Sequence, residues 1–421
     1  MAVVVGHSTV VHTSLGDLRG TAEGGVAVWR GVPYAEQPVG ERRFLAPAPL
    51  QPWTGVRDAL EHGPLPPQSK SFVGGGRDDP KVRDEACLTL TVWSPDTSGS
   101  LPVMVWIPGG AFVFGAGQFQ LYNGSRLAAN GNVVVVNVTY RIGVFGGFEL
   151  SDLGDRFDDN LALRDQMAAL RWIREQIAAF GGDPDRVTVF GESAGATSVL
   201  ALLASPAADG LFRRAIAQSP ALPLIIGTNS HEASMFAWTK PPMLPTTTAS
   251  IDAYLNRVAP DAKDRVLAAY PDYPRRRALV AFGSDVMFGG PAWAFADAYS
   301  AHAPTHMYRF DHFGWSLRML GLGATHGSEI VHIQHSYASF IGRKLHPLGR
   351  RLQPPVGRRM QRAWLDFAAK GWDTGEILWS SGHDWPMYDT EHRFTRIILS
   401  ARDMVVEDPD TERRKAWAGL Y

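Results

Sequence analysis

Residues 187–196 constrain the fold more than any other part of this 421-residue sequence. They read Val-Thr-Val-Phe-Gly-Glu-Ser-Ala-Gly-Ala, an apolar stretch typical of a buried strand, then a Gly-x-Ser-x-Gly turn and a helix start of small residues. A serine that protrudes from so sharp a turn needs strained backbone angles and small neighbours, because larger side chains would clash. The following helix directs its N–H groups and positive dipole end toward the serine. The pattern therefore indicates a nucleophile at Ser193.

A second strand that runs into a turn lies upstream. Residues 103–107 are apolar and lead into Pro108, Gly109, Gly110 and Ala111. Because no large side chain blocks the approach, two backbone N–H groups of such a turn can point at one oxyanion. A Gly-rich turn with a purely structural purpose is the alternative, and the presence of the serine turn favours the oxyanion role.

Short valine-rich stretches alternate with helical periodicity in the first half of the chain. We expect buried strands over residues 88–93, 102–107, 133–138 and 187–190. A helix is expected between the last two strands, over residues 165–180. Strands that alternate with helices predict an α/β fold with a mostly parallel central sheet and helices on both faces. Residues 10–30 alternate apolar and polar positions, which predicts an N-terminal antiparallel hairpin.

Past residue 219 the pattern becomes mostly helical. We expect helices over residues 251–267, 291–300 and 358–370, and strands over 305–311 and 393–399. Nothing in the composition marks a linker between domains. The sequence therefore predicts a single α/β domain over residues 1–421.

Composition and charge exclude several classes of protein. The 41 basic and 42 acidic side chains give a net charge of -1, which gives no support for a nucleic-acid partner. No apolar run approaches the length of a membrane span, and the N-terminus lacks the features of a signal peptide. Cys87 is the lone cysteine and cannot form an internal disulfide, which is compatible with a cytoplasmic protein. We see no cluster of metal ligands and no phosphate-binding loop, so we expect no metal and no cofactor.

Short motifs spread over nearly the whole chain carry a family resemblance. They occupy residues 30–35, 85–90, 109–112, 160–166, 180–184, 191–195, 323–329 and 364–368. In this order they resemble the type-B carboxylesterase family, which includes the bacterial para-nitrobenzyl esterases and the cholinesterases. The resemblance implies an α/β-hydrolase fold, a small-molecule ester as substrate and no cofactor, and it implies no particular oligomeric state.

The resemblance also implies roles for individual residues. Ser193 would be the nucleophile, His326 the general base and Glu232 the acid, in the chain order expected of α/β-hydrolases. The backbone donors of the oxyanion hole would be Gly110, Ala111 and Ala194.

The assignment of the acid has alternatives. Carboxylates at strand ends are often structural, and Glu329 or Asp285 could serve in place of Glu232. His231 adjoins Glu232, but neighbours in a strand point to opposite faces.

The base is one of 13 histidines. His326 stands out because it lies in a Gly-rich loop late in the chain, after Gly321 and Gly323. His332 and His335 follow closely, and we expect both to be structural.

The chain departs from the family in the length of one segment. Glu232 lies 39 residues after Ser193, whereas relatives usually place a helical insertion of many tens of residues in this gap. A reduced helical insertion after residue 219 would leave the site open, with less apolar surface to grip a long acyl chain. We therefore expect a cleft that takes short to medium or aromatic esters.

Two other functions are compatible with the same pattern. Some relatives have lost the serine and act as binding proteins, although all three triad candidates are present here. The same triad also serves hydrolases of thioester, amide or carbamate bonds.

Overall fold

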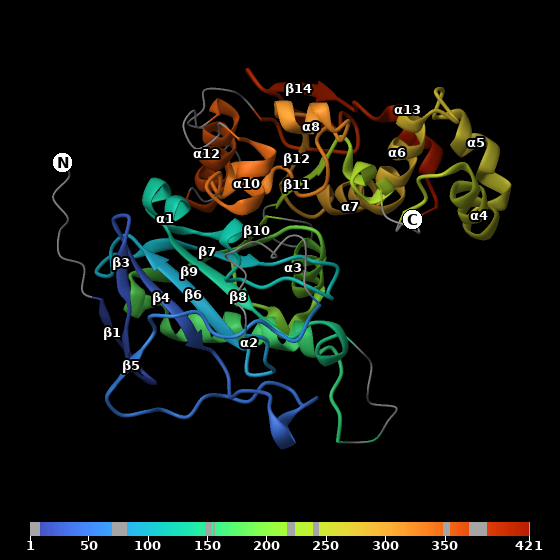
Figure 1. Cartoon of the computed structure of the whole chain (residues 1–421). Coiled ribbons are helices and arrows are strands. Elements are labelled where there is room, and N and C mark those ends of the chain that lie inside the picture. Colours follow the sequence, from blue (N-terminus) through green and yellow to red (C-terminus); the bar gives the residue numbers. More distant parts are fainter. Residues whose placement is uncertain are drawn as a thin grey trace.

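Eleven strands form one mixed sheet at the centre of the computed structural model, in the order β14-β13-β12-β11-β10-β9-β7-β8-β6-β4-β3 (Figure 1). The structure describes residues 9–69, 82–147, 154, 156–216, 224–238, 244–347, 354–369 and 385–420. A smaller sheet of β1, β2 and β5 lies beside β3 and β4 of the large sheet.

The strands are short and regularly spaced. They are β1 (Val10–Thr13), β2 (Gly16–Arg19), β3 (Thr21–Glu23), β4 (Val26–Pro33), β5 (Val56–Asp58), β6 (Thr89–Ser94), β7 (Leu101–Ile107), β8 (Val134–Thr139), β9 (Gly182–Gly191), β10 (Arg214–Ile216), β11 (Leu224–Asn229), β12 (Thr305–Phe310), β13 (Phe394–Ile398) and β14 (Met404–Glu407). The expected strands over 88–93, 102–107, 133–138 and 187–190 are confirmed as β6, β7, β8 and β9.

The helices in the described part of the chain range from one turn to about four. They are α1 (Ser125–Gly131), α2 (Leu161–Gln176), α3 (Ala194–Ala204), α4 (Thr248–Val258), α5 (Lys263–Ala268), α6 (Arg276–Ser284), α7 (Gly290–Ser300), α8 (Trp315–Met319), α9 (Ile330–Ile333), α10 (Phe340–Leu345), α12 (Pro355–Ala369) and α13 (Thr411–Trp417). The expected helix over 165–180 is α2 followed by a short 3-10 turn, Ile177–Phe180.

The middle of the large sheet is parallel and its ends are antiparallel. The run from β8 through β7, β9, β10, β11 and β12 to β13 pairs in parallel. The pairs β3–β4, β4–β6, β6–β8 and β13–β14 are antiparallel. The predicted α/β fold with a mostly parallel sheet is therefore confirmed, and so is the N-terminal hairpin, which is the antiparallel pair β1–β2.

Helices cover both faces of this sheet, which explains why its central strands are apolar at successive positions. Along β7, Val103 and Val105 face the core that includes α2 and α3, while Met104 and Trp106 face the core that includes α1, α9 and α12. The two faces alternate with the period of two that a strand imposes. Figure 1 shows α2 below the sheet and α12 above it.

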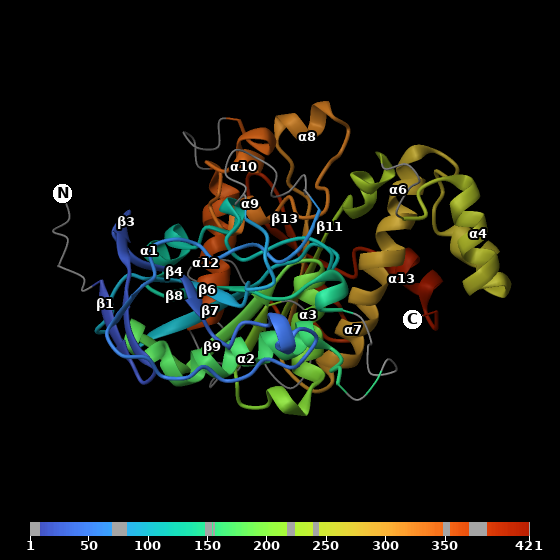
Figure 2. The same ribbon diagram turned by 60° about the horizontal axis from the view of Figure 1, so that its bottom comes forward.

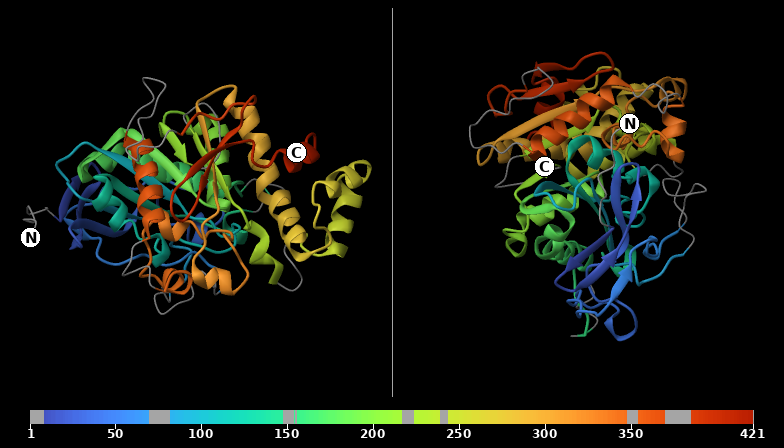
Figure 3. Two further views of the ribbon diagram at one scale, coloured as in Figure 1. Left: turned by 90° about the horizontal axis from the view of Figure 1, so that it is seen from above. Right: turned by 90° about the vertical axis from the view of Figure 1, so that its left-hand side faces the viewer.

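A third core lies toward the C-terminal half. Residues of β11 and β12 pack there against α4, α6, α7 and α13. Figures 2 and 3 show α4 and α6 at the end of the molecule opposite the N-terminal strands. The expectation of one helix over 251–267 is corrected here, because α4 and α5 are separated by the turn Pro260–Ala262. Proline at the start of that turn prevents a continuous helix.

The expectation about apolar runs also needs a correction. The continuous helical run Arg276–Ser300, made of α6, a π-helical turn (Asp285–Gly289) and α7, is 25 residues long and apolar enough to cross a membrane by length and composition. Slightly more than half of its most apolar window, 56%, is buried inside the fold. Phe282, Ala292 and Ala296 are fully buried in the third core, which is how a core helix behaves.

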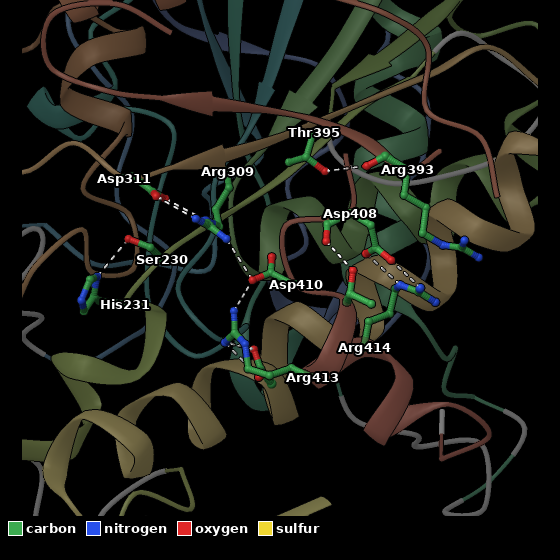
Figure 4. Close-up of polar contacts among 12 residues, drawn as sticks. Ser230, His231, Arg309, Asp311, Arg393, Thr395, Asp408, Asp410, Arg413 and Arg414 are labelled. Atoms are coloured by element: carbon green, nitrogen blue, oxygen red, sulfur yellow. Dashed lines mark hydrogen bonds and ion pairs between the residues drawn. The ribbon is translucent and has the colours of Figure 1, made fainter. Parts of the chain in front are cut away.

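Ion pairs tie the C-terminal segments to the edge of the sheet. Arg309 of β12 binds Asp311 at 2.9 Å and Asp410 at 2.9 Å, and Arg413 of α13 pairs with the same Asp410 (Figure 4). Arg413 also reaches Asp285 of the π-helical turn, at 3.0 Å. The network thus links β12, the π-helical turn and α13.

The most deeply buried ion pair holds α2 against the end of β8. Two guanidinium nitrogens of Arg141 lie 2.8 and 2.6 Å from the carboxylate of Asp165, and the two side chains are 2% and 0% exposed. Arg141 also donates to the carbonyl oxygen of Leu45, 2.8 Å away. Such a bidentate ion pair is stabilising while both side chains are present, but removal of one leaves the other as an uncompensated buried charge.

We predict that Arg141→Leu lowers the free energy of unfolding by about 3–5 kcal/mol, because Asp165 is left as an uncompensated buried charge. Urea denaturation followed by circular dichroism measures the change. The control is Arg174→Leu, since Arg174 pairs with Asp185 on the surface, with side chains 42% and 65% exposed. That variant should lose about 1 kcal/mol or less, and equal losses in both variants would contradict the prediction.

Candidate active site

Ser193 lies on a sharp turn between β9 and α3, as the sequence predicts. Its φ of 57° falls in the left-handed region, which non-glycine residues rarely adopt. The two flanking turns touch backbone to backbone: a Cβ on Gly195 would lie 2.1 Å from the carbonyl oxygen of Ile107, and one on Gly109 would lie 2.3 Å from that of Glu192. Glycine is therefore required at both positions for the serine turn to sit against the end of β7.

The turn after β7 is also unusual in its backbone. Gly110, Ala111 and Phe112 have successive φ values of 124°, 52° and 60°. The carbonyl oxygen of Gly110 accepts hydrogen bonds from the N–H groups of Val113 and Phe114, both at 3.0 Å, which closes the turn. Within the part of the chain that the structure describes, the N–H groups of Gly110 and Ala111 donate to no other group.

Ala194 contributes a third N–H group from the first position of α3. An N–H group in the first turn of a helix has no acceptor within the helix. Ala111, Ser193 and Ala194 all line the same cavity. The arrangement thus offers backbone donors beside the hydroxyl of Ser193, where a negative charge could be stabilised.

His326 lies between two glutamates. Its Nδ1 is 2.7 Å from Oε2 of Glu232, and its Nε2 is 2.9 Å from Oε1 of Glu192. The rings of Phe236 and Phe288 pack on the imidazole, with centroid distances of 5.5 and 4.6 Å. His326 and Ser193 line one cavity, but in this structure Nε2 faces Glu192.

Glu232 begins a 3-10 turn, Glu232–Ser234, three residues after the last residue of β11. Its Oε1 accepts a hydrogen bond from the backbone N–H of Asn229 at 2.7 Å, which leaves Oε2 directed at His326. The structure therefore brings together His326 and the glutamate that the sequence favours.

The two alternative acids have other partners. Oε2 of Glu329 accepts from the side-chain amide of Asn229 at 2.6 Å, although Glu329 lines the same cavity. Asp285 accepts from the hydroxyl of Tyr270 at 2.6 Å and pairs with Arg413. Of the three candidates, Glu232 is the one whose carboxylate contacts His326.

His231 points away from this site. Its Nδ1 lies 2.9 Å from the hydroxyl of Ser230, as Figure 4 shows, and its ring lines a separate cavity beside Asp311 and Arg413. Glu232, the next residue, lines the cavity of Ser193. The two side chains therefore face different cavities, but not because they alternate in a strand: both residues lie after the end of β11 at Asn229.

The sequence does not predict the contact between Glu192 and His326. The position of Glu192 next to Ser193 was visible, but nothing in the sequence shows that the loop carrying His326 returns to it, 134 residues later. Its side chain is 15% exposed, so its charge is poorly screened by water.

Burial and the neighbouring carboxylates shift the pKa values of His326 and Glu329. Burial alone would lower the pKa of His326, but Glu192 and Glu232 on either side outweigh it and hold the pKa well above 6.5. Burial, and then the charges of Glu232 and Glu192, raise the pKa of Glu329 to about 8. The carboxylates therefore favour the protonated imidazole of His326, and burial favours the uncharged form of Glu329.

The cavity has a volume of about 350 Å³. Besides Ser193 and His326 it is lined mostly by large apolar side chains: Trp106, Phe190, Ile216, Ile225, Phe236, Leu244, Phe288, Tyr308, Ile330, Ile333 and Trp364. An apolar cavity with a few convergent polar groups is typical of a small-molecule site.

The fold brings together three histidines that the sequence does not single out as a group. One ring nitrogen of each of His312, His332 and His346 lies within 4.8 Å of the others, an arrangement that could hold a metal ion. They are 20 and 14 residues apart in the sequence, a spacing with no recognisable pattern, so only the fold reveals them. His335 lies outside the cluster.

Comparisons with known proteins place the chain among the carboxylesterases. The model of the carboxylesterase family matches residues 7–239 and 220–417. The para-nitrobenzyl esterase of Bacillus subtilis (strain 168) is 34% identical over 96% of this chain and 98% of its own length. Human cocaine esterase is 30% identical over 93% of this chain and 87% of its own length. Among solved structures, a carboxylesterase of Geobacillus stearothermophilus matches with a TM-score of 0.84 and 32% identity, over 97% of this chain and all of that one.

The alignment with one relative also shows a difference in chain length. The match to the Bacillus subtilis enzyme spans 498 positions, although this chain has 421 residues. That relative therefore carries segments that this chain lacks. The reduced insertion is expected after residue 219, and residues 217–223 lie outside the described residues.

We predict that the imidazole of His326 is protonated at pH 7 in the free protein, because two carboxylates raise its pKa. ¹⁵N NMR of histidine-labelled protein distinguishes the charged ring from the neutral one. Glu192→Gln removes one negative charge and should move the titration of His326 to lower pH. Glu175→Gln, on the exposed side of α2, should leave it in place. A His326 titration at or below pH 6.5 in the unmodified protein would contradict the assignment.

Proposed function

This chain belongs to the carboxylesterase family and hydrolyses carboxylic ester bonds, and we propose that it does so through a Ser193–Glu232–His326 triad and an acyl-enzyme intermediate. The observation that carries the proposal is the 2.7 Å contact between Nδ1 of His326 and Glu232, in a cavity that also holds the strained Ser193. A serine, a histidine and a buried carboxylate in this relation act as nucleophile, base and orienting acid on many unrelated folds.

In the first step, His326 takes the proton of Ser193 as the serine oxygen attacks the ester carbonyl. The base must be neutral and its Nε2 must be available, so the ion pair with Glu192 has to break before the reaction. Glu232 holds Nδ1–H and stabilises the imidazolium that forms.

The negative charge that develops on the carbonyl oxygen needs donors that are already in place. We assign this role to the N–H groups of Gly110, Ala111 and Ala194. Loss of one such donor typically costs about 10²–10³-fold in rate. The alcohol then leaves with the proton from His326, and water repeats the attack on the acyl-enzyme.

We propose short to medium or aromatic esters as substrates. The cavity of about 350 Å³ is at the small end of the range for ligand sites, and its walls carry several aromatic rings. The names of the relatives point the same way, since para-nitrobenzyl and cocaine esters contain aromatic groups.

Ser193→Ala should lower the turnover of p-nitrophenyl acetate by at least about 10⁴-fold, because the proposed acyl-enzyme forms on the hydroxyl of Ser193. The assay follows nitrophenolate release at pH 8. Ser205→Ala, at the far end of α3, is the matched control and should keep the activity of the unmodified enzyme. Turnover in Ser193→Ala comparable to that of the control would contradict the proposed nucleophile.

A series of p-nitrophenyl esters tests the proposed substrate class. We expect kcat/KM to be greatest for acyl chains of two to about eight carbons and to fall for palmitate, because a small cavity cannot bury a long chain. A steep rise of kcat/KM toward palmitate would show that the acyl chain binds elsewhere.

A further inference from the structure

Three histidines from separate segments meet beside the sheet. His312 follows β12, His332 lies in α9 and His346 ends α10. One ring nitrogen of each lies within 4.8 Å of one nitrogen of each of the others. The ring centroids of His332 and His346 are 4.5 Å apart, and those of His312 and His332 are 5.0 Å apart.

The nitrogens of these rings fall into two groups. Nδ1 of His312 lies 2.7 Å from the hydroxyl of Ser400, and Nδ1 of His332 lies 2.8 Å from that of Tyr337. The Nε2 atoms of His312, His332 and His346 are all buried, and none has a hydrogen-bond partner among the described residues. Three unsatisfied nitrogens in one place are unusual, because buried polar atoms are nearly always paired.

Histidines in metal sites use their two ring nitrogens in the same way. A histidine that binds a metal through one nitrogen almost always donates its other N–H to a neighbouring oxygen, which fixes the ring orientation. The hydroxyls of Ser400 and Tyr337 are placed to accept those hydrogen bonds. With Nδ1 of His312 and of His332 engaged in this way, their Nε2 atoms are left as the available ligand atoms.

We propose that His312, His332 and His346 bind one divalent transition-metal ion, with Zn²⁺ as the best candidate, through their Nε2 atoms. Imidazole nitrogens favour Zn²⁺ over Mg²⁺ or Ca²⁺, which take oxygen ligands. Zinc–nitrogen bonds of about 2.0–2.1 Å require the three nitrogens to come closer together than their present limit of 4.8 Å. Rotation of the side chains on binding would bring the nitrogens together, and water would complete the four-coordinate site.

The site is separate from the ester-hydrolysing centre but lies on the same segment. Ile330 and Ile333 of α9 line the cavity of Ser193, whereas His332 does not. His326 precedes α9 by four residues. An ion bound to His332 therefore joins the loop after β12, α9 and α10 into one unit, and its role is to stabilise that unit.

The test uses chelator-treated, untagged full-length protein, titrated with ZnCl₂ and analysed by mass spectrometry of the bound metal. We expect one Zn²⁺ per chain and a rise in Tm that chelation reverses. His312→Gln and His346→Gln should each weaken Zn²⁺ binding by about 100-fold or more and abolish the rise in Tm. His335→Gln is the matched control, because His335 is buried nearby but lies outside the cluster, and it should bind like the unmodified protein.

Cobalt gives a second readout that reports on the ligands. Co²⁺ should produce the intense visible bands of a four-coordinate site in the unmodified protein and in His335→Gln, but not in His312→Gln. Should a ligand variant fail to fold by circular dichroism, Ser400→Ala keeps all three ligands and should weaken Zn²⁺ binding by about 10-fold. The proposal is overturned if the unmodified protein binds no Zn²⁺ equivalent, or if His312→Gln, His346→Gln and His335→Gln bind equally.

Discussion

The site depends on the contact between two backbone turns that have no side chains between them. A Cβ at Gly109 or at Gly195 would lie within 2.3 Å of a backbone oxygen, so neither position tolerates a larger residue without movement of the sheet ends. This contact holds Ser193 in its strained conformation and fixes the neighbouring N–H groups beside it. Groups fixed in advance need no reorganisation when charge develops, which is the main advantage of an oxyanion site.

Electrostatics impose a second condition on the same site. His326 is surrounded by the carboxylates of Glu192 and Glu232 and by two aromatic rings, where charges interact more strongly than in water. The ion pair with Glu192 stabilises the protonated ring, and therefore opposes the proposed transfer of a proton from Ser193. A substrate that separates Glu192 from Nε2 would favour the neutral base. The energy of that ion pair is then part of the barrier that substrate binding has to overcome.

Much of the fold and part of the site could be predicted from the sequence, because the relevant signals are local. The valine runs of β7 and β8 follow from burial on both faces, and the small residues around Ser193 follow from the sharpness of its turn. The contact of Glu192 with His326 could not be predicted, since it depends on the path of a loop more than a hundred residues away. The same holds for His312, His332 and His346, whose meeting is decided by how β12, α9 and α10 pack.

The segment that follows β12 serves two purposes, and this explains its composition. It must hold His326 in the wall of an apolar cavity, yet α8, α9 and α10 are each too short to be stable by themselves. Burial of Ile330, Val331 and Ile333 supplies part of the stability. His332 is the polar residue of α9, and it is buried. Each nitrogen of a buried imidazole needs a partner. The proposed metal ion, shared with His312 and His346, satisfies this need at the point where three short elements meet. Loss of the ion would then alter the position of the proposed base, His326, which lies four residues before α9.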